Sequence, residues 1–283
     1  VGEAQVDSGG SVGKSGLAMA FFGADVRLMG KIGKDEFGEI AGHIVKAHGV
    51  KEGLIVSEDS HTSYTVVLSL PGQDRIFLHH PGANDTFSFD DLDLDVVRRA
   101  SVFHFGYPPL MQRLYSNGGQ ELVRIFKEVS ALGVVTSLDL AAVDPTSEAG
   151  GVDWQAVLKE TLPYVDLFAP SVEELLFMLD RSKLNDLEAK ANGKDLTGVI
   201  DIDRDVKPLA ETVLQMGVKV ALIKCGEPGL YFRTAGIDKI SLMAEKLGFP
   251  LTGWAGRAGL NPATCRSVCF PPPERGTCTS RRF

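Results

Sequence analysis

The sequence has few cysteines, no long apolar run and no excess of basic residues. Cys225 is the only cysteine in the first 264 residues, which argues against a disulfide framework there. No apolar run approaches the roughly 18–20 residues that a membrane-spanning helix needs. Lysine and arginine number 29 against 37 aspartates and glutamates, so the net charge is −8. General affinity for nucleic acid is therefore not expected.

The remaining composition is that of a globular protein. Hydrophobic residues make up 44% and charged residues 23% of the 283 positions. The chain opens with Val1-Gly2-Glu3, without the basic and apolar segments of a secretory signal. We therefore expect a cytoplasmic protein with a sizeable core and no membrane or nucleic-acid partner.

Short apolar runs alternate with amphipathic segments along most of the chain. The predicted strands cover residues 26–30, 101–105, 134–138, 165–169, 218–224 and 229–233. The predicted helices cover residues 15–22, 38–48, 119–132, 154–161, 172–179 and 206–216. Strands separated by helices at this spacing predict an α/β fold with a mostly parallel sheet, covered by helices on both faces.

Three segments depart from this alternation. Residues 62–70 and 75–80 are β-rich and flank the turn Pro71-Gly72-Gln73-Asp74, so they predict a hairpin. Residues 181–205 are polar and aperiodic and predict a surface insertion. Residues 239–283 show little periodicity beyond Gly253 and carry a net basic charge, and they predict an aberrant or disordered tail, either frame-shifted or natural.

The N-terminal glycines allow two interpretations. Gly13-Lys14-Ser15 matches the end of a phosphate-binding loop, but Ser8 stands where that motif requires glycine and no strand precedes it. Alternatively, Gly9-Gly10 is followed by a small-residue helix ending at Gly23, and then by Gly30-x-x-Gly33-x-Asp35-x-x-Gly38. Adjacent glycines let the backbone approach a ligand closely, because no Cβ intervenes.

The second pattern resembles the N-terminal signature of the ribokinase-like (PfkB) carbohydrate kinases. The resemblance continues in order along the chain to about Thr234. Its further pieces are His79-His80-Pro81-Gly82-Ala83-Asn84, Ser137-Leu138-Asp139, the segment from Asp166 to Glu174, and Lys224-Cys225-Gly226-Glu227-Pro228-Gly229.

The resemblance implies a ribokinase-like fold and transfer of a phosphoryl group from ATP to a sugar hydroxyl, with Mg²⁺ bridging the phosphates. It implies an α/β domain over 1–53 and 85–238, and a β-lid over 54–84 that allows a homodimer. The candidate substrate-binding residues are Gly9, Gly10, Lys14 and Asn84, the nucleotide-side residues are Lys224, Gly226 and Gly229, and the metal-side residue is Glu174.

Several of these residues also have simpler explanations. Asp35 is better explained as a helix cap than as a catalyst. Glu174 alone is an ordinary acid in the first turn of a helix. A zinc site at His79-His80 is rejected, because adjacent strand residues point to opposite faces.

The sequence departs from the family pattern in three places. Lys14 and Ser171 each stand where the family has asparagine, and no Gly-Asp dipeptide follows Gly229. In the family such a dipeptide supplies the catalytic base, so none is nominated here. We expect a sugar kinase that is impaired or inactive. The alternatives are a non-catalytic sugar or nucleoside sensor of the same fold and, less well supported, a phosphate-loop NTPase.

Overall fold

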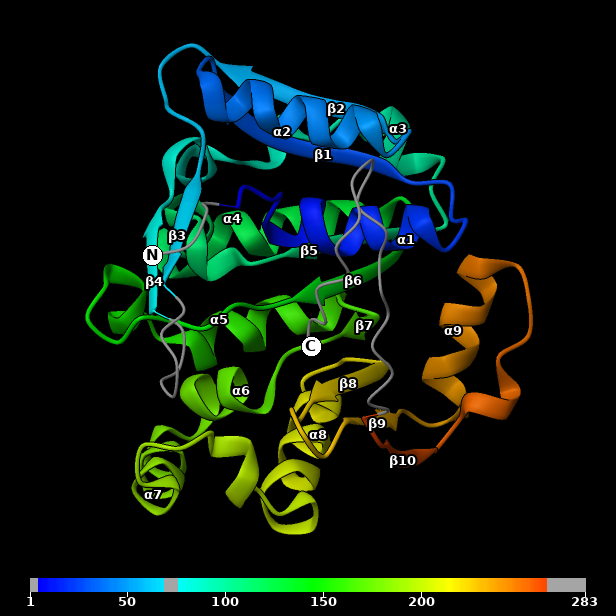
Figure 1. Ribbon diagram of the computed structural model, residues 1–283. Helices are drawn as coiled ribbons and strands as arrows, with labels where there is room; N and C mark the ends of the chain where they lie inside the picture. Colours follow the sequence, from blue (N-terminus) through cyan, green and yellow to red (C-terminus); the bar gives the residue numbers. More distant parts are fainter. Residues whose placement is uncertain (1–4, 69–75, 264–283) are drawn as a thin grey trace.

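The computed structural model describes residues 5–68 and 76–263, and its centre is a six-stranded sheet (Figure 1). The strand order is β10-β9-β8-β7-β6-β5. The strands are β5 Val102–Gly106, β6 Val135–Asp139, β7 Leu167–Phe168, β8 Val220–Lys224, β9 Leu230–Thr234 and β10 Ala258–Asn261. Strands β5 to β8 are parallel, and β9 and β10 are antiparallel to their neighbours. The predicted mostly parallel sheet is confirmed.

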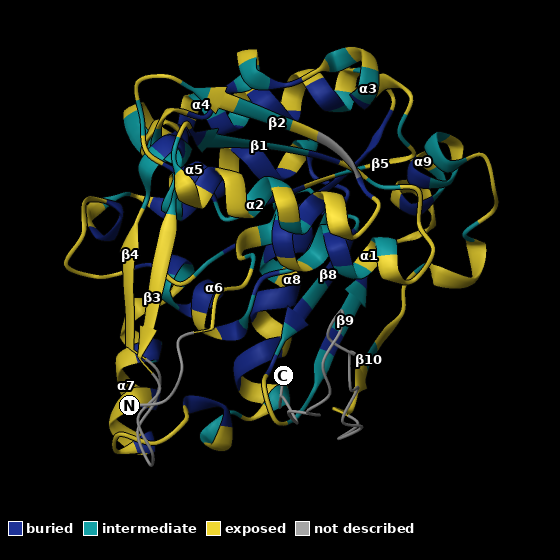
Figure 2. Ribbon diagram, turned by 45° about the horizontal axis from the view of Figure 1, so that its top comes forward, coloured by how far each residue is buried: buried dark blue, intermediate teal, exposed yellow. Residues whose placement is uncertain are grey.

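Helices cover both faces of this sheet, because successive side chains of a strand point to opposite faces and both faces are apolar. The helices are α1 Leu17–Phe21, α2 Glu36–Ala47, α3 Leu94–Arg98, α4 Gln112–Ala131, α5 Trp154–Thr161, α6 Val172–Leu179, α7 Arg181–Ala191, α8 Lys207–Gln215 and α9 Ile237–Leu247. Ala221 and Ile223 of β8 join the main core with side chains of α4, α5, α6 and α8. Val220, on the other face, packs with Ile240 and Met243 of α9. Figure 2 shows this buried layer in dark blue.

A separate two-stranded parallel sheet lies beside the central one. It consists of β1 Arg27–Gly33 and β2 Lys51–Ser57, joined by α2. Asp35 caps α2 by accepting a hydrogen bond from the Gly38 amide at 2.9 Å, which confirms the predicted cap. The predicted lid boundary at Leu54 is corrected, because residues 54–57 pair with β1 in this sheet.

The predicted hairpin is present, and its first strand begins at Tyr64 instead of residue 62. Strands β3 Tyr64–Leu68 and β4 Ile76–His80 pair antiparallel, with Tyr64 opposite His80 and Leu68 opposite Ile76. All ten residues of the two strands are exposed. The predicted turn at 71–74 lies outside the described residues.

Two predictions of irregular structure are wrong for the described part of the chain. The segment 181–205 contains α7, whose Leu184 and Leu187 are buried. The expected tail contains the rest of α9 and also β10, which pairs with β9 up to Asn261. The strand β10 is short and largely exposed, so it has no hydrophobic alternation from which to predict it. Residues 264–283 of the predicted tail lie outside the described residues.

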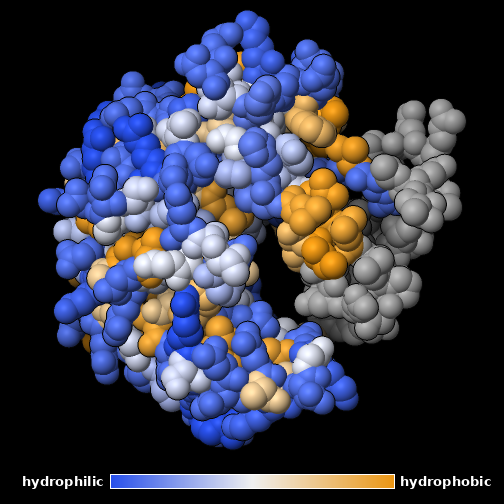
Figure 3. Space-filling view, turned by 90° about the vertical axis from the view of Figure 1, so that its left-hand side faces the viewer, coloured by the Kyte–Doolittle hydropathy of each residue, from blue (hydrophilic) through white to orange (hydrophobic). Residues whose placement is uncertain are grey.

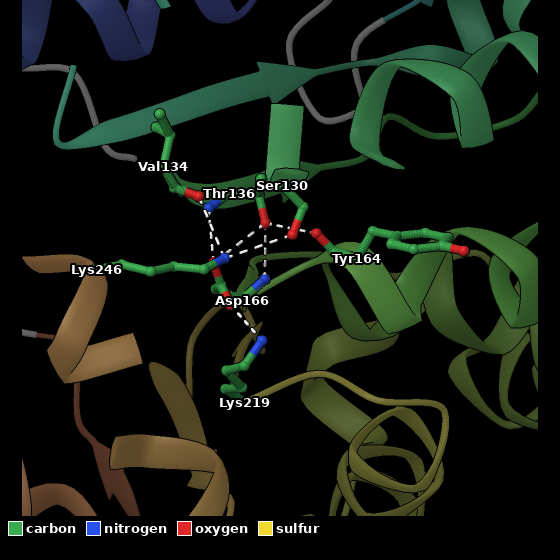
Figure 4. Close-up of polar contacts among 7 residues, drawn as sticks. All are labelled: Ser130, Val134, Thr136, Tyr164, Asp166, Lys219 and Lys246. Atoms are coloured by element: carbon green, nitrogen blue, oxygen red, sulfur yellow. Dashed lines mark hydrogen bonds and ion pairs between the residues drawn. The ribbon is translucent and has the colours of Figure 1, made fainter. Parts of the chain in front are cut away.

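An ion cluster fastens α9 at the amino ends of the parallel strands (Figure 4). Asp166 is fully buried and accepts hydrogen bonds from the Thr136 amide at 2.9 Å and from Lys246 Nζ at 2.9 Å. Lys219 donates to its other carboxylate oxygen. Burial alone would raise the pKa of Asp166, but Lys219, Lys246 and Thr136 together lower it. The cluster therefore joins α9 to the strands it covers.

Among the described residues, no helix has the length and apolar character needed to cross a bilayer.

Candidate active site at the carboxyl edge of the sheet

The parallel strands bring polar side chains together where they end. Asp139 is the last residue of β6 and Lys224 the last residue of β8. Asp139 Oδ1 accepts hydrogen bonds from Lys224 Nζ at 2.6 Å and from the Leu140 amide at 2.8 Å. The Asp139 side chain is 12% exposed and the Lys224 side chain 43% exposed. Ligands of open parallel sheets bind at this edge, and the half-exposed ammonium faces solvent there.

Glu174 joins this group from the first turn of α6. Ser171 and Glu174 form a capping box, in which Glu174 Oε2 accepts the Ser171 amide at 2.6 Å and Ser171 Oγ accepts the Glu174 amide at 3.1 Å. Burial raises the pKa of Glu174, and Asp139 adds to this, whereas Lys224 and the Ser171 amide oppose it. The predicted first-turn acid is therefore also a buried carboxylate beside a lysine.

Tyr107 closes the group at the end of β5. Its backbone is left-handed, with φ 72° and ψ 42°, and its amide donates to the Asp139 carbonyl at 3.2 Å. Burial raises the pKa of the Tyr107 hydroxyl, and the nearby charges of Asp139 and Glu174 raise it further. A non-glycine residue held in this conformation is costly and often marks a functional site.

The predicted nucleotide-side glycines form a tight turn directly after Lys224. The Gly229 amide donates to the Gly226 carbonyl at 3.0 Å, and both glycines have positive φ. A Cβ on Gly226 would lie 2.4 Å from Thr197 Cγ2, and one on Gly229 would lie 2.2 Å from the Asn261 carbonyl oxygen. Glycine is required at both positions by conformation and by space.

The predicted substrate-side glycines lie at the same edge. Gly10 has φ 70° and begins the helical turn that carries Ser11. A Cβ on Gly106, at the end of β5, would lie 2.6 Å from Ser11 Cβ and 3.8 Å from Asp139 Cβ. The structure therefore brings the chain around Gly9-Gly10 close to the Asp139–Lys224 pair. In the sequence, Gly9 and Lys224 are 215 residues apart.

Lys14 and Asn84 are placed differently. Lys14 Nζ pairs with Asp7 at 2.7 Å, and both side chains are about half exposed. Residues 12–16 are helical, so they do not form the open loop of a phosphate-loop motif. The geometry therefore does not support the NTPase alternative. Asn84 lies in the short helix Gly82–Thr86 directly after the hairpin. A sugar contact by either residue stays a prediction.

The hairpin lies on the side of the molecule opposite α9 (Figure 1). The face of the molecule that carries it shows an apolar patch beside a hollow (Figure 3). The exposed apolar side chains of the hairpin are those of Tyr64, Val66, Val67, Leu68, Ile76, Phe77 and Leu78.

Sequence analysis nominated Glu174 and Lys224 as candidates but assigned no role to Asp139 or Tyr107. A signal for Asp139 was available, because a polar residue that ends a buried strand lies at the ligand-binding edge of a parallel sheet. Tyr107 gave only a weak signal, its position before Pro108-Pro109. Among the described residues, no group of three or more metal-ligating side chains occurs. Asp139 and Glu174 both place acidic oxygens at this edge.

The fold agrees with comparisons to known proteins. The model of the pfkB family carbohydrate kinases matches residues 3–242, and the chain belongs to this family. It is 28% identical over 182 residues to a probable fructokinase-4 of Arabidopsis thaliana, covering 63% of this chain and 54% of that protein. The chain therefore spans about half the length of this relative.

Solved structures show the same fold. The fructokinase of Xylella fastidiosa with bound ATP superimposes with a TM-score of 0.59 at 18% identity, covering 84% of this chain and 71% of that one. The ribokinase of Giardia lamblia superimposes with a TM-score of 0.59 at 15% identity, covering 88% and 64%. The predicted ribokinase-like fold is confirmed.

Proposed function

We propose that this protein binds a sugar and ATP at the carboxyl edge of its sheet and transfers the γ-phosphoryl group to a sugar hydroxyl. The observation that carries the proposal is the meeting of Asp139, Glu174 and Lys224 at the carboxyl ends of the parallel strands, in a chain that belongs to a carbohydrate kinase family. An ammonium that is paired with one carboxylate and lies near a second suits a phosphate ligand, because it can exchange one anionic partner for another.

The acidic side chains fit Mg²⁺ as a partner of the nucleotide. Mg²⁺ takes one or two carboxylates together with phosphate oxygens and water, and Glu174 and Asp139 offer such hard oxygen donors. When bound, Mg²⁺ would neutralise charge on the phosphates. The capping box holds the Glu174 side chain by one oxygen, which fixes its orientation toward the edge.

Residues of this chain would bind the nucleotide on one side of this edge and the sugar on the other. Lys224 would donate to phosphate oxygens, and the turn at Gly226 and Gly229 would let the nucleotide approach the backbone. Gly9 and Gly10 would allow a similar approach of the sugar on the other side. The exposed hairpin would cover the sugar and exclude water, as lids do.

We further propose that the chain of 283 residues transfers phosphoryl groups slowly. Its last aspartate is Asp238, in the first turn of α9, which lies at the opposite edge of the sheet. Asp139 is close to the sugar side but is engaged by Lys224, so accepting a proton would cost that ion pair. Absence of a positioned base costs about 10²–10⁴-fold in rate.

A kinase assay with a panel of ketoses, aldoses and nucleosides, ATP and Mg²⁺ tests both statements. Sugar-dependent ADP release, abolished by Lys224→Met, is expected at a low rate. Turnover near the usual 1–100 s⁻¹ of kinases would contradict the slow-transfer proposal. Sugar binding in calorimetry with no ADP release at all would favour a non-catalytic sensor, and binding of neither ligand would overturn the proposed function.

The lid also motivates a proposal about assembly. The hairpin exposes apolar side chains on a two-stranded sheet that buries little of its own surface. We propose that two copies of the chain pair through this sheet. Sedimentation analysis should give a dimer for the wild type and a monomer for Val66→Lys with Leu78→Lys. A monomeric wild type at tens of micromolar would contradict it.

A further inference from the structure

Asp35 does more than cap α2, because its carboxylate also contacts the foot of the hairpin. Oδ2 accepts the Thr62 amide at 2.7 Å, and Oδ1 accepts the Thr62 hydroxyl at 2.6 Å in addition to the Gly38 amide. Thr62 is buried and lies two residues before β3. One carboxylate thus joins the start of a helix to the entrance of the hairpin, although the two lie 27 residues apart.

The contact extends to the end of β1. Thr62 Oγ1 accepts the Gly33 amide at 2.8 Å while its own proton is given to Asp35. A Cβ on Gly33 would lie 2.4 Å from the Ser60 carbonyl oxygen, and one on Gly38 would lie 2.3 Å from the Gly33 carbonyl oxygen. The glycine spacing of this segment therefore serves close packing of three chain segments around Asp35.

The second strand of the hairpin is held at the same place. The Ala83 amide, three residues after β4, donates to the His61 carbonyl at 2.7 Å. A Cβ on Gly82 would lie 2.3 Å from that same carbonyl oxygen. Both feet of the hairpin therefore converge on residues 61–62, and residue 62 is bound to Asp35.

The hairpin needs such an anchor because its ladder gains little from burial. Its ten strand residues are all exposed. Beyond the foot, the ring of Phe37 in α2 stacks on Tyr64 with 5.2 Å between centroids, and both rings remain more than 40% exposed. Isolated two-stranded hairpins are at best marginally stable in water.

We propose that Asp35 is a positioning residue for the lid, which fixes the hairpin over the sugar side of the carboxyl edge without contacting either substrate. The kinetic part of this inference rests on the proposed function, whereas the anchoring part does not. Loss of the anchor should loosen the hairpin first and weaken sugar capture as a consequence.

The decisive variant is Asp35→Ser, because serine caps helices as well as aspartate but has one oxygen on a shorter side chain. It keeps an acceptor for the Gly38 amide and gives up the bonds to Thr62. Thr62→Val removes the hydroxyl bonds to Asp35 and Gly33 but keeps the amide bond to Asp35, and Thr62→Ser should keep all of them. Asp153→Ser is the matched control, since Asp153 caps α5 through the Ala156 amide.

Hydrogen exchange of residues 64–68 and 76–80 is the primary readout. Asp35→Ser and Thr62→Val should exchange about tenfold faster or more there, as expected for lost bonds to a charged acceptor. Asp153→Ser and Thr62→Ser should match the wild type. Equal hairpin exchange in Asp35→Ser and the wild type would overturn the anchor, provided that circular dichroism shows both folded.

Steady-state kinetics or calorimetry supplies the second readout. In Asp35→Ser the KM or Kd for the sugar should rise at least several-fold, while the value for ATP stays within about twofold of the wild type. A faster-exchanging hairpin with unchanged sugar affinity would overturn the positioning role. If no sugar binds the wild type, the proposed function fails, and the exchange result alone still decides the anchor.

Discussion

The ion cluster around Asp166 should make a large electrostatic contribution to the stability of the fold. Asp166 is fully buried, and the Lys219 and Lys246 side chains that pair with it are only 12% and 18% exposed. Asp166→Asn keeps the shape of the side chain and removes its charge. Two lysines would then lie at the amino edge of the sheet without a counter-charge.

The expected loss in the free energy of unfolding depends on which charged partner is removed. Removal of one member of a buried ion pair destabilises by about 3–5 kcal/mol, because the other charge is left buried. Lys246→Met leaves the Asp166–Lys219 pair intact and removes one charge-assisted bond, for a cost of about 1.5–3 kcal/mol. Glu211→Gln removes a more exposed pair with Arg233 and should cost less than about 1 kcal/mol.

Urea unfolding followed by circular dichroism and tryptophan fluorescence measures these costs. The two tryptophans report different regions, since Trp154 is buried in α5 and Trp254 follows α9. The folded pKa of Asp166 is lowered, so its stabilisation is present above its ordinary pKa of 3.8 and is lost as pH falls below it. The gap between wild type and Asp166→Asn should therefore narrow below about pH 4. An Asp166→Asn cost below about 1 kcal/mol, or one equal to that of Glu211→Gln, would refute the reasoning.

Three further predictions concern the carboxyl edge. Glu174→Gln should leave the free energy of unfolding at pH 7 within about 1 kcal/mol of the wild type, because glutamine can complete the capping box and burial already disfavours the charged form. The same variant should weaken Mg²⁺-dependent ATP binding in calorimetry. Lys224→Met should weaken ATP binding about tenfold or more, whereas Lys159→Met on α5 should not. Gly226→Ala should cost about 1–2 kcal/mol in thermal unfolding, because φ is 65° and Thr197 fills the space, whereas Gly42→Ala in α2 should be neutral or stabilising. Unchanged ATP affinity in the first two variants, or equal effects at the two glycines, would contradict these assignments.

Periodicity predicted the elements that pack against the core. Helices α5 and α6 match their predicted bounds of 154–161 and 172–179, because each presents one apolar face to the sheet. The strand predicted over 165–169 is regular only at Leu167–Phe168, although the backbone of Asp166 still bonds to Thr136 and Val220 of the neighbouring strands. Short elements at the periphery, such as α7 and β10, were missed because polar residues dominate their exposed faces.

The site was less predictable than the fold. Gly226 and Gly229 could be assigned to a tight turn, because turns with positive φ leave a glycine signal in the sequence. The pairing of Asp139 with Lys224 could not, since it joins residues 85 positions apart through the order of strands in the sheet. The second role of Asp35 was likewise hidden, because a cap is local but its contact with Thr62 depends on where the hairpin begins.

Aspartate–lysine clusters occur at both ends of the parallel strands, and their surroundings give them different roles. At the amino edge, Asp166 is fully buried and is satisfied by two lysines and a backbone amide, so binding a ligand there would require breaking bonds that hold α9. At the carboxyl edge, Lys224 pairs with Asp139, remains 43% exposed, and lies beside Glu174, whose pKa is raised by burial. An incoming phosphate could replace that partner at little structural cost, because no helix depends on the pair. The same residue types therefore stabilise the fold where they are enclosed and remain available for chemistry where they are open to solvent.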